Sequence, residues 1–201
     1  MLRETSRTTV LPVSVDDLKV HLRIASTAIA GGSSAEDALL ESYEMAAIRR
    51  GENLTRRAWM RTKWELTLDS FPTGQMVLPR PPLTTIAAEV VVTYIDPAAA
   101  VQTLGATGYG IDERSEPGSL IPSTESSEDW PDTNDVFNAV TVTFFSGYAT
   151  ATTNVIPESI QQWIRLQVGQ MYEFREPVAD GSLNTQRRDF LDGLLDPYIV
   201  F

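Results

Sequence analysis

The stretch VIPESIQQWIRLQVGQMYEFRE, Val155 to Glu176, decides how the rest of the chain is interpreted. Pro157 suits a first helical turn, where its missing N–H needs no partner, and Pro177 disfavours continuation of a helix. Between the two prolines, apolar residues recur at spacings of three and four, which is the period of a helix with one buried face. These residues are Ile160, Trp163, Ile164, Val168, Met171 and Tyr172. The stretch therefore predicts a helix over residues 157–176 that packs one face against a core.

Two further helices are predicted upstream. Ser14 is a typical N-cap residue and predicts a helix over residues 14–24. Ser33 or Ser34, with an acidic residue three positions later, has the pattern of a capping box and predicts a helix over residues 34–55. We therefore expect the N-terminal third of the chain to be helical.

The middle of the chain, from about residue 62 to residue 146, alternates polar and apolar residues as half-buried strands do. Because this region lies between helical regions, the order predicts an α+β fold: N-terminal helices, a central antiparallel β-meander, a long C-terminal helix and a terminal arm. We expect a core domain over residues 1–176 and the arm over residues 177–201. The acidic, serine-rich segment 116–138 predicts a long mobile loop.

Composition argues against several classes of site. The chain has 201 residues, of which 42% are hydrophobic, no cysteine and a single histidine, His21. This content excludes disulfides, thiolate nucleophiles and multi-histidine metal sites within one chain. No phosphate-binding loop, nucleophile elbow or zinc-protease motif is present, and no apolar run approaches a bilayer-spanning length. We therefore expect a protein that is not an enzyme, holds no cofactor and no metal, and does not enter a membrane.

Charge is unevenly distributed along a chain whose net charge is −11. A basic cluster includes Arg49, Arg50, Arg56, Arg57, Arg61 and Lys63, whereas residues 113–135 are strongly acidic. A chain polarised in this way can pair its basic surface with an acidic surface of a neighbour. The alternative interpretation is a solvated surface, in which Arg49 and Arg50 only complement the end of a helix.

Two other segments are candidate interaction sites. The terminal arm carries two arginines and a series of large apolar residues that either fold back onto the domain or dock on another chain. These residues are Arg187, Arg188, Phe190, Leu191, Leu194, Leu195, Tyr198, Ile199 and Phe201. The acidic loop offers a competing hypothesis: Trp130 together with Asp129 or Asp132 would form the site of a small carboxylate-dependent hydrolase or a carbohydrate-binding protein.

A series of short motifs resembles one protein family across Val13 to Glu176. In order they are LKVHLR, the helix end E-x-x-T-x-R within ENLTRR, LPRPPL, the Y-x-D turn in YID, and SGY followed by PESI and YEFRE. Together they resemble the head–tail connector (adaptor) proteins of tailed phages and of gene transfer agents. The segment YIDPAAAVQTL departs from the glycine turn that is common in that family.

The resemblance implies a structural subunit of a virion or phage-like particle, assembled in the host cytoplasm. It implies a ring of about twelve copies beneath the portal protein, which extends the DNA channel without sequence-specific binding and receives a tail-side stopper or completion protein. The basic cluster would then contact a neighbouring subunit or the portal, and the C-terminal arm would dock on the portal. The alternative is a stopper or tail-completion protein, which would contact the tail instead.

Overall fold

The structure is a computed structural model that describes residues 1–24, 34, 36–84, 89–123, 129–148, 156–174 and 191–200. Its contacts group into two compact units, each built from segments that are far apart in the sequence. The β unit comprises Met1–Thr8 and Met60–Thr153, and the helical unit comprises Thr9–Trp59 and Asn154–Phe201. The chain passes between the units near residues 8, 59 and 153, and the terminal segment is grouped with the helical unit.

The β unit contains a five-stranded antiparallel sheet in the order β1-β2-β8-β4-β5. Its strands are β1 (Leu2–Arg7), β2 (Thr62–Leu68), β4 (Val91–Ile95), β5 (Val101–Leu104) and β8 (Val140–Ser146). The predicted antiparallel strands are thus present, and β8 lies between β2 and β4 rather than at an edge. Strand β8 belongs in the middle because its alternate residues Val140, Val142 and Phe144 are completely buried.

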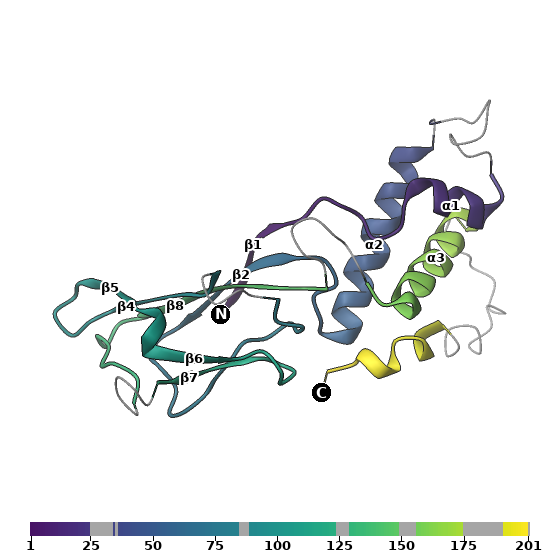
Figure 1. The fold of residues 1–201 in the computed structure, drawn as a ribbon. Helices are drawn as coiled ribbons and strands as arrows, with labels where there is room; N and C mark the ends of the chain where they lie inside the picture. Colours follow the sequence, from purple (N-terminus) through teal and green to yellow (C-terminus); the bar gives the residue numbers. More distant parts are fainter. Residues whose placement is uncertain are drawn as a thin grey trace, which may run out of the picture. The chain divides into compact units, whose positions relative to one another are not determined.

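A second, three-stranded sheet has the order β3-β7-β6, and Figure 1 shows it as a separate layer from the first sheet. Its strands are β3 (Met76–Val77), β6 (Tyr109–Asp112), which follows the 3-10 turn η2 (Ala106–Gly108), and β7 (Ser119–Pro122). The core of the β unit includes Met76 and Leu120 from this sheet and Trp64 and Leu66 from the larger one. The hydroxyl of Tyr109 also donates to the Val90 carbonyl at 2.9 Å.

The helical unit contains α1 (Val15–Leu22), α2 (Asp37–Thr55), α3 (Glu158–Glu173) and the 3-10 turn η3 (Asp196–Tyr198). The long predicted helix is confirmed as α3, with Ile160, Trp163, Ile164 and Val168 fully buried. Trp59, which is also fully buried, meets Trp163 edge-on, with ring centroids 5.6 Å apart. The buried aromatic pair therefore joins the segment after α2 to α3.

Of the two predicted N-terminal helix starts, one is confirmed and the other is wrong. The N-cap at Ser14 is confirmed, because its hydroxyl accepts a hydrogen bond from the Asp17 amide at 3.1 Å. The capping box at the start of the second helix is wrong: α2 begins at Asp37, and its N-cap residue, Glu36, makes no side-chain cap. Ser33 lies outside the described residues, and the carbonyl of Ser34 accepts a backbone hydrogen bond from Asp37 instead.

Two strands were not predicted. Strand β1 pairs with β2 along the edge of the large sheet, although its sequence LRETSR lacks the alternation of a half-buried strand. Strand β7 falls within the segment that was predicted to be a mobile loop. Strand β1 depends on its partner strand, since backbone pairing needs no apolar side chain of its own. Strand β7 is too short for a recognisable alternation, although its Leu120 is fully buried.

Candidate interaction surfaces

The motifs that carry the family resemblance mostly hold the fold together. In the helix end ENLTRR, the Glu52 carboxylate accepts from the Trp59 amide at 2.8 Å, and the Thr55 hydroxyl accepts from the Trp59 indole at 3.2 Å. In SGY, the Ser146 hydroxyl accepts from the Trp64 indole at 2.8 Å. Gly147 follows at a φ of 122°, where a Cβ atom would lie 2.3 Å from the Met60 carbonyl oxygen. These positions are therefore explained by packing and capping without any reaction chemistry.

The basic cluster is divided between the two units. Arg49, Arg50 and Arg56 are exposed on the second half of α2 and at its C-cap, in the helical unit. Arg50 donates one hydrogen bond to the Gln167 side chain at 3.3 Å and is still an exposed residue. These three residues are the members of the cluster that form an accessible positive surface on one element.

Arg57 points into the helical unit. It is only 7% exposed, and its Nε donates to the Tyr198 carbonyl oxygen at 2.6 Å. It therefore ties the C-terminal segment to the end of α2.

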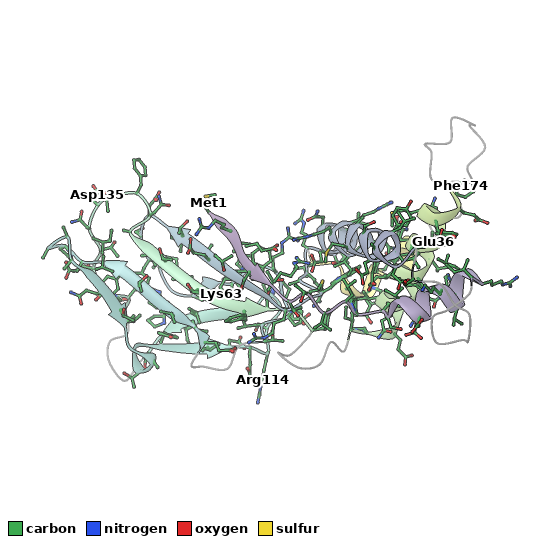
Figure 2. The ribbon with its side chains drawn as sticks, turned by 90° about the horizontal axis from the view of Figure 1, so that it is seen from above. Met1, Glu36, Lys63, Arg114, Asp135 and Phe174 are labelled. Atoms are coloured by element: carbon green, nitrogen blue, oxygen red, sulfur yellow. The ribbon has the colours of Figure 1, made fainter. Side chains whose placement is uncertain are left out.

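Arg61 and Lys63 lie on the β unit around Phe145. Arg61 makes a bidentate ion pair with Glu89 at 2.7 and 2.8 Å, and its guanidinium lies 4.1 Å from the centroid of the Phe145 ring. The ammonium of Lys63, labelled in Figure 2, lies 5.9 Å from the same centroid. Arg61 is thus largely neutralised, and these two residues form a separate cluster from the arginines of α2.

The described part of the C-terminal segment packs on the helical unit. Leu195 is 1% exposed, the Val200 amide donates to the Thr55 carbonyl at 3.1 Å, and the Trp163 indole donates to the Asp192 carboxylate at 3.4 Å. Leu191, Leu194, Tyr198 and Ile199 are half-buried in the same segment. Arg187, Arg188, Phe190 and Phe201 lie outside the described residues. Of the two alternatives for the arm, folding back is the arrangement that residues 191–200 adopt.

The side chain of Trp130 packs against and hydrogen-bonds to other residues of the β unit. Its ring stacks on Phe71 with centroids 5.0 Å apart and an interplanar angle of 3°, and its indole donates to the Gly74 carbonyl at 2.6 Å. Tyr94 meets Phe71 edge-on at 5.7 Å. Because one face and the N–H of Trp130 are used internally, the competing hydrolase or carbohydrate hypothesis gains no support from this residue.

The loop after Trp130 presents an exposed aromatic side chain that sequence reasoning missed. Phe137 is 87% exposed and the adjacent Val136 is 43% exposed. The backbone on either side is fixed, because the Asn134 amide donates to the Ile95 carbonyl at 2.9 Å and the Asn138 amide donates to Asp69 at 2.8 Å. The sequence gives no periodic signal for this side chain, since it stands in a segment without regular structure.

Several carboxyl and hydroxyl groups have shifted pKa values. Hydrogen bonds from the Ala100 amide and then from the Gln102 side chain lower the pKa of Asp96, which organises the β4–β5 turn. A hydrogen bond from the Ser115 hydroxyl lowers the pKa of Asp112 in the same manner. Burial raises the pKa of Tyr109. Each of these groups has a structural partner, so the shifts reflect turns and packing.

Glu44 is a fully buried carboxyl group on α2. Its Oε1 accepts from the Val13 amide at 2.9 Å, while its buried Oε2 has no hydrogen-bond partner among the described residues. Burial raises its pKa from 4.5 to about 7; the Val13 hydrogen bond lowers it, Glu41 raises it and Arg165 lowers it, in decreasing order of effect. The carboxyl group therefore fastens the segment before α1 to α2, in a state close to its titration midpoint at neutral pH.

Within the described ranges, no three or more His, Asp or Glu side chains gather in a way that could hold a metal ion. None of the helices in this part of the chain is long and apolar enough to cross a membrane. What the structure does present is a set of charged and apolar surfaces.

Comparison with solved structures gives full-length matches in fold. One matched chain comes from the neck of an empty GTA particle computed with C6 symmetry, at a TM-score of 0.76 and 23% identity. A second comes from the virion of a native gene transfer agent (GTA) particle, at 0.76 and 22%. A third comes from the neck of a native GTA particle computed with C12 symmetry, at 0.70 and 22%. Each match covers 100% of this chain and 96% of the other.

The chain shares their fold. No family model matches the sequence, and no curated protein matches it. The predicted α+β architecture is thus confirmed.

Proposed function

We propose that this protein is a head–tail connector (adaptor) subunit, a structural component that forms a ring under the portal of a phage or gene transfer agent particle. The observation that carries the proposal is the full-length match, at a TM-score of 0.76, to a chain from the neck of a GTA particle. The match includes both the β unit and the helical unit, since it covers 100% of this chain. The order of motifs along the sequence supports the same assignment independently.

A ring places specific demands on the subunit. In a closed cyclic assembly each copy contacts its two neighbours through two different surfaces. The neck particles were computed with C6 and C12 symmetry, which supports an assembly of about twelve copies for a chain of this fold. The exposed arginines of α2 and the acidic surface of the β unit are two such different surfaces on one chain.

The negative net charge of the protein is compatible with a channel through which DNA passes. Tight binding to DNA requires many Lys and Arg side chains that neutralise phosphates. The net charge is −11, and two of the basic candidates, Arg57 and Arg61, already bind groups of the protein itself. A ring of such subunits would let DNA pass without holding it.

The C-terminal segment is the proposed contact with the portal. Its described residues lie on the helical unit, so portal docking would use the half-buried side chains Leu194, Tyr198 and Ile199 or would displace the segment. The half-burial of these apolar groups supports a second partner for them. No bond is made or broken in this function, and no cofactor takes part.

The experiment is to locate the chain in purified particles. A copy carrying a small fused tag is incorporated into particles and identified by electron microscopy as added density along the neck. We expect added density immediately below the portal, in a ring. Density one layer further from the head would identify a stopper or tail-completion protein instead, and density absent from the neck would refute a connector role.

A further inference from the structure

The strongest unassigned feature is an apolar and acidic surface at one end of the β unit. Three segments meet there, residues 69–75, 94–104 and 129–138, joined by hydrogen bonds from Trp130 to Gly74, from Asn138 to Asp69 and from Asn134 to Ile95. We call this surface the acidic end, and Figure 2 labels its residue Asp135. Its carboxylates are Asp69, Asp96, Asp129, Asp132 and Asp135, and the three segments contain no Lys or Arg.

The same three segments also expose apolar side chains. Phe137 is 87% exposed, Val101 is 74% exposed and Val136 is 43% exposed. Met1, which is 81% exposed, lies at the end of β2 that leads into residue 69, because its ammonium donates to the Thr67 carbonyl and its carbonyl accepts from the Thr67 amide. Phe137 is held by a fixed backbone, with Asp135 two residues before it and Asp69 bonded to the amide of the next residue. An exposed aromatic side chain among aspartates has the composition of an interface anchor with a polar rim.

A complementary surface lies on the second half of α2. We call it the α2 basic face. Its exposed residues are Ser42, Ala46, Arg49, Arg50, Asn53, Leu54 and Arg56. The acidic residues of the same stretch, Glu44 and Glu52, are buried, so no exposed carboxylate interrupts this face. Leu54, which is 45% exposed, gives it an apolar centre next to Arg50 one helical turn away.

We propose that the acidic end of one copy docks on the α2 basic face of a second copy of this chain, with Phe137 packed beside Leu54. This inference rests on the proposed ring. The occupant is a second copy because the aspartates of the acidic end complement the arginines of the α2 basic face, and each surface also exposes an apolar side chain, Phe137 and Leu54. The contact is heterologous, since the two surfaces differ, and a heterologous contact builds a ring when its rotation closes, as the proposed connector ring requires.

The chemistry of the contact sets its salt dependence. Aspartate and arginine side chains that face each other at a rim are screened by added salt, whereas the packing of Phe137 is not. Self-association should therefore weaken as ionic strength rises without disappearing. The acidic rim also repels a second acidic end, which selects the α2 basic face over like-with-like pairing.

The first experiment measures self-association of the full chain, alone and on portal-containing heads, by sedimentation and electron microscopy. Phe137→Ser and Arg56→Glu should each weaken it about tenfold or more, as loss of one interface anchor does. Val20→Ser is the control for the first variant, because Val20 is 66% exposed on α1. Arg23→Glu is the control for the second, because Arg23 and Arg56 are both exposed helix C-caps with φ of 60° and 56°. Both controls should assemble as the wild type does.

The second experiment uses the absence of cysteine in the chain. Copies carrying Phe137→Cys are mixed with differently tagged copies carrying Leu54→Cys, and a short thiol-reactive cross-linker is added to the assembled sample. We expect mixed cross-linked dimers, and none above background when Val20→Cys replaces Leu54→Cys. Because each copy carries one thiol, every product reports a contact between chains.

The outcomes separate this inference from the proposed function. Rings that form normally with Phe137→Ser and give no mixed dimer would overturn the contact and leave the connector role intact. Rings that form but no longer receive tail-side proteins would assign the acidic end to a different protein, which also overturns the contact. Failure of the wild type to form rings both alone and on heads would refute the connector role itself.

Discussion

Replacing Glu44 with glutamine tests the most perturbed group in the helical unit. The carboxyl group is fully buried, and burial raises its pKa from 4.5 to about 7. Since the folded-state pKa lies above the unfolded value, the protonated form stabilises the fold. That stabilisation is complete below about pH 4.5 and is lost as the pH rises through 7. The neutral amide of glutamine keeps an acceptor for the Val13 amide and does not titrate.

The size of the effect follows from the two pKa values. Their difference corresponds to about 3 kcal/mol of unfolding free energy, at about 1.4 kcal/mol for each pH unit. The unfolding free energy of wild type minus that of Glu44→Gln should therefore fall by about 3 kcal/mol between pH 4 and pH 8. Taking the difference between the two proteins removes the contribution of every other titrating group that they share.

The assay is urea unfolding at a series of pH values, followed by tryptophan fluorescence. Trp59 and Trp163 lie in the core of the helical unit and report on it. Glu41→Gln is the control, because Glu41 is exposed on the same helix and contributes less than burial to the raised pKa. A free-energy difference that stays constant over this pH range would refute the argument that burial keeps Glu44 protonated near neutrality.

The remaining predictions concern packing, and urea unfolding measures each of them. Gly51→Ala should destabilise the helical unit by about 2 kcal/mol, because its Cβ would lie 1.8 Å from the Trp59 ring. Gly169→Ala should instead stabilise it by up to about 1 kcal/mol, since its nearest neighbour atoms are 3.7 Å away and alanine favours helix; the opposite order would contradict both. Leu195→Ala should cost about 2–5 kcal/mol if the C-terminal segment stays folded back, and a negligible loss would show that this segment is detached in solution. Arg57→Met should cost about 2 kcal/mol by removing the hydrogen bond to a carbonyl of that segment, and an unchanged stability would return Arg57 to the accessible basic cluster.

Local patterns predicted the elements that have a strong period. Helix α3 and strand β8 were both recognisable, because residues such as Trp163 and Phe144 recur at the spacing that brings them to one face. The N-cap at Ser14 was recognisable because it involves groups only three residues apart. In each case the physical cause lies within one or two turns of the chain, so the sequence contains the whole signal.

The elements and side chains that were missed depend on distant partners. Strand β1 exists because β2 offers a free edge about 60 residues later in the chain. Arg57 and Arg56 are adjacent and chemically identical, yet one is buried against the Tyr198 carbonyl and the other is exposed. No local pattern distinguishes them, because the distinction is made by a segment 141 residues away.

By itself, the sequence determined the α+β class, the long helix, the acidic balance and the order of motifs that suggested a connector. Periodicity and composition are properties of neighbouring residues and of totals, and both can be read from a single chain. The tertiary structure alone decided which members of each charged or apolar group face outward. The fold buries Glu44 and Arg57, and it leaves Phe137 exposed in an acidic segment. Contact between surfaces depends on that choice, because a side chain can meet a partner only where the rest of the fold leaves it uncovered.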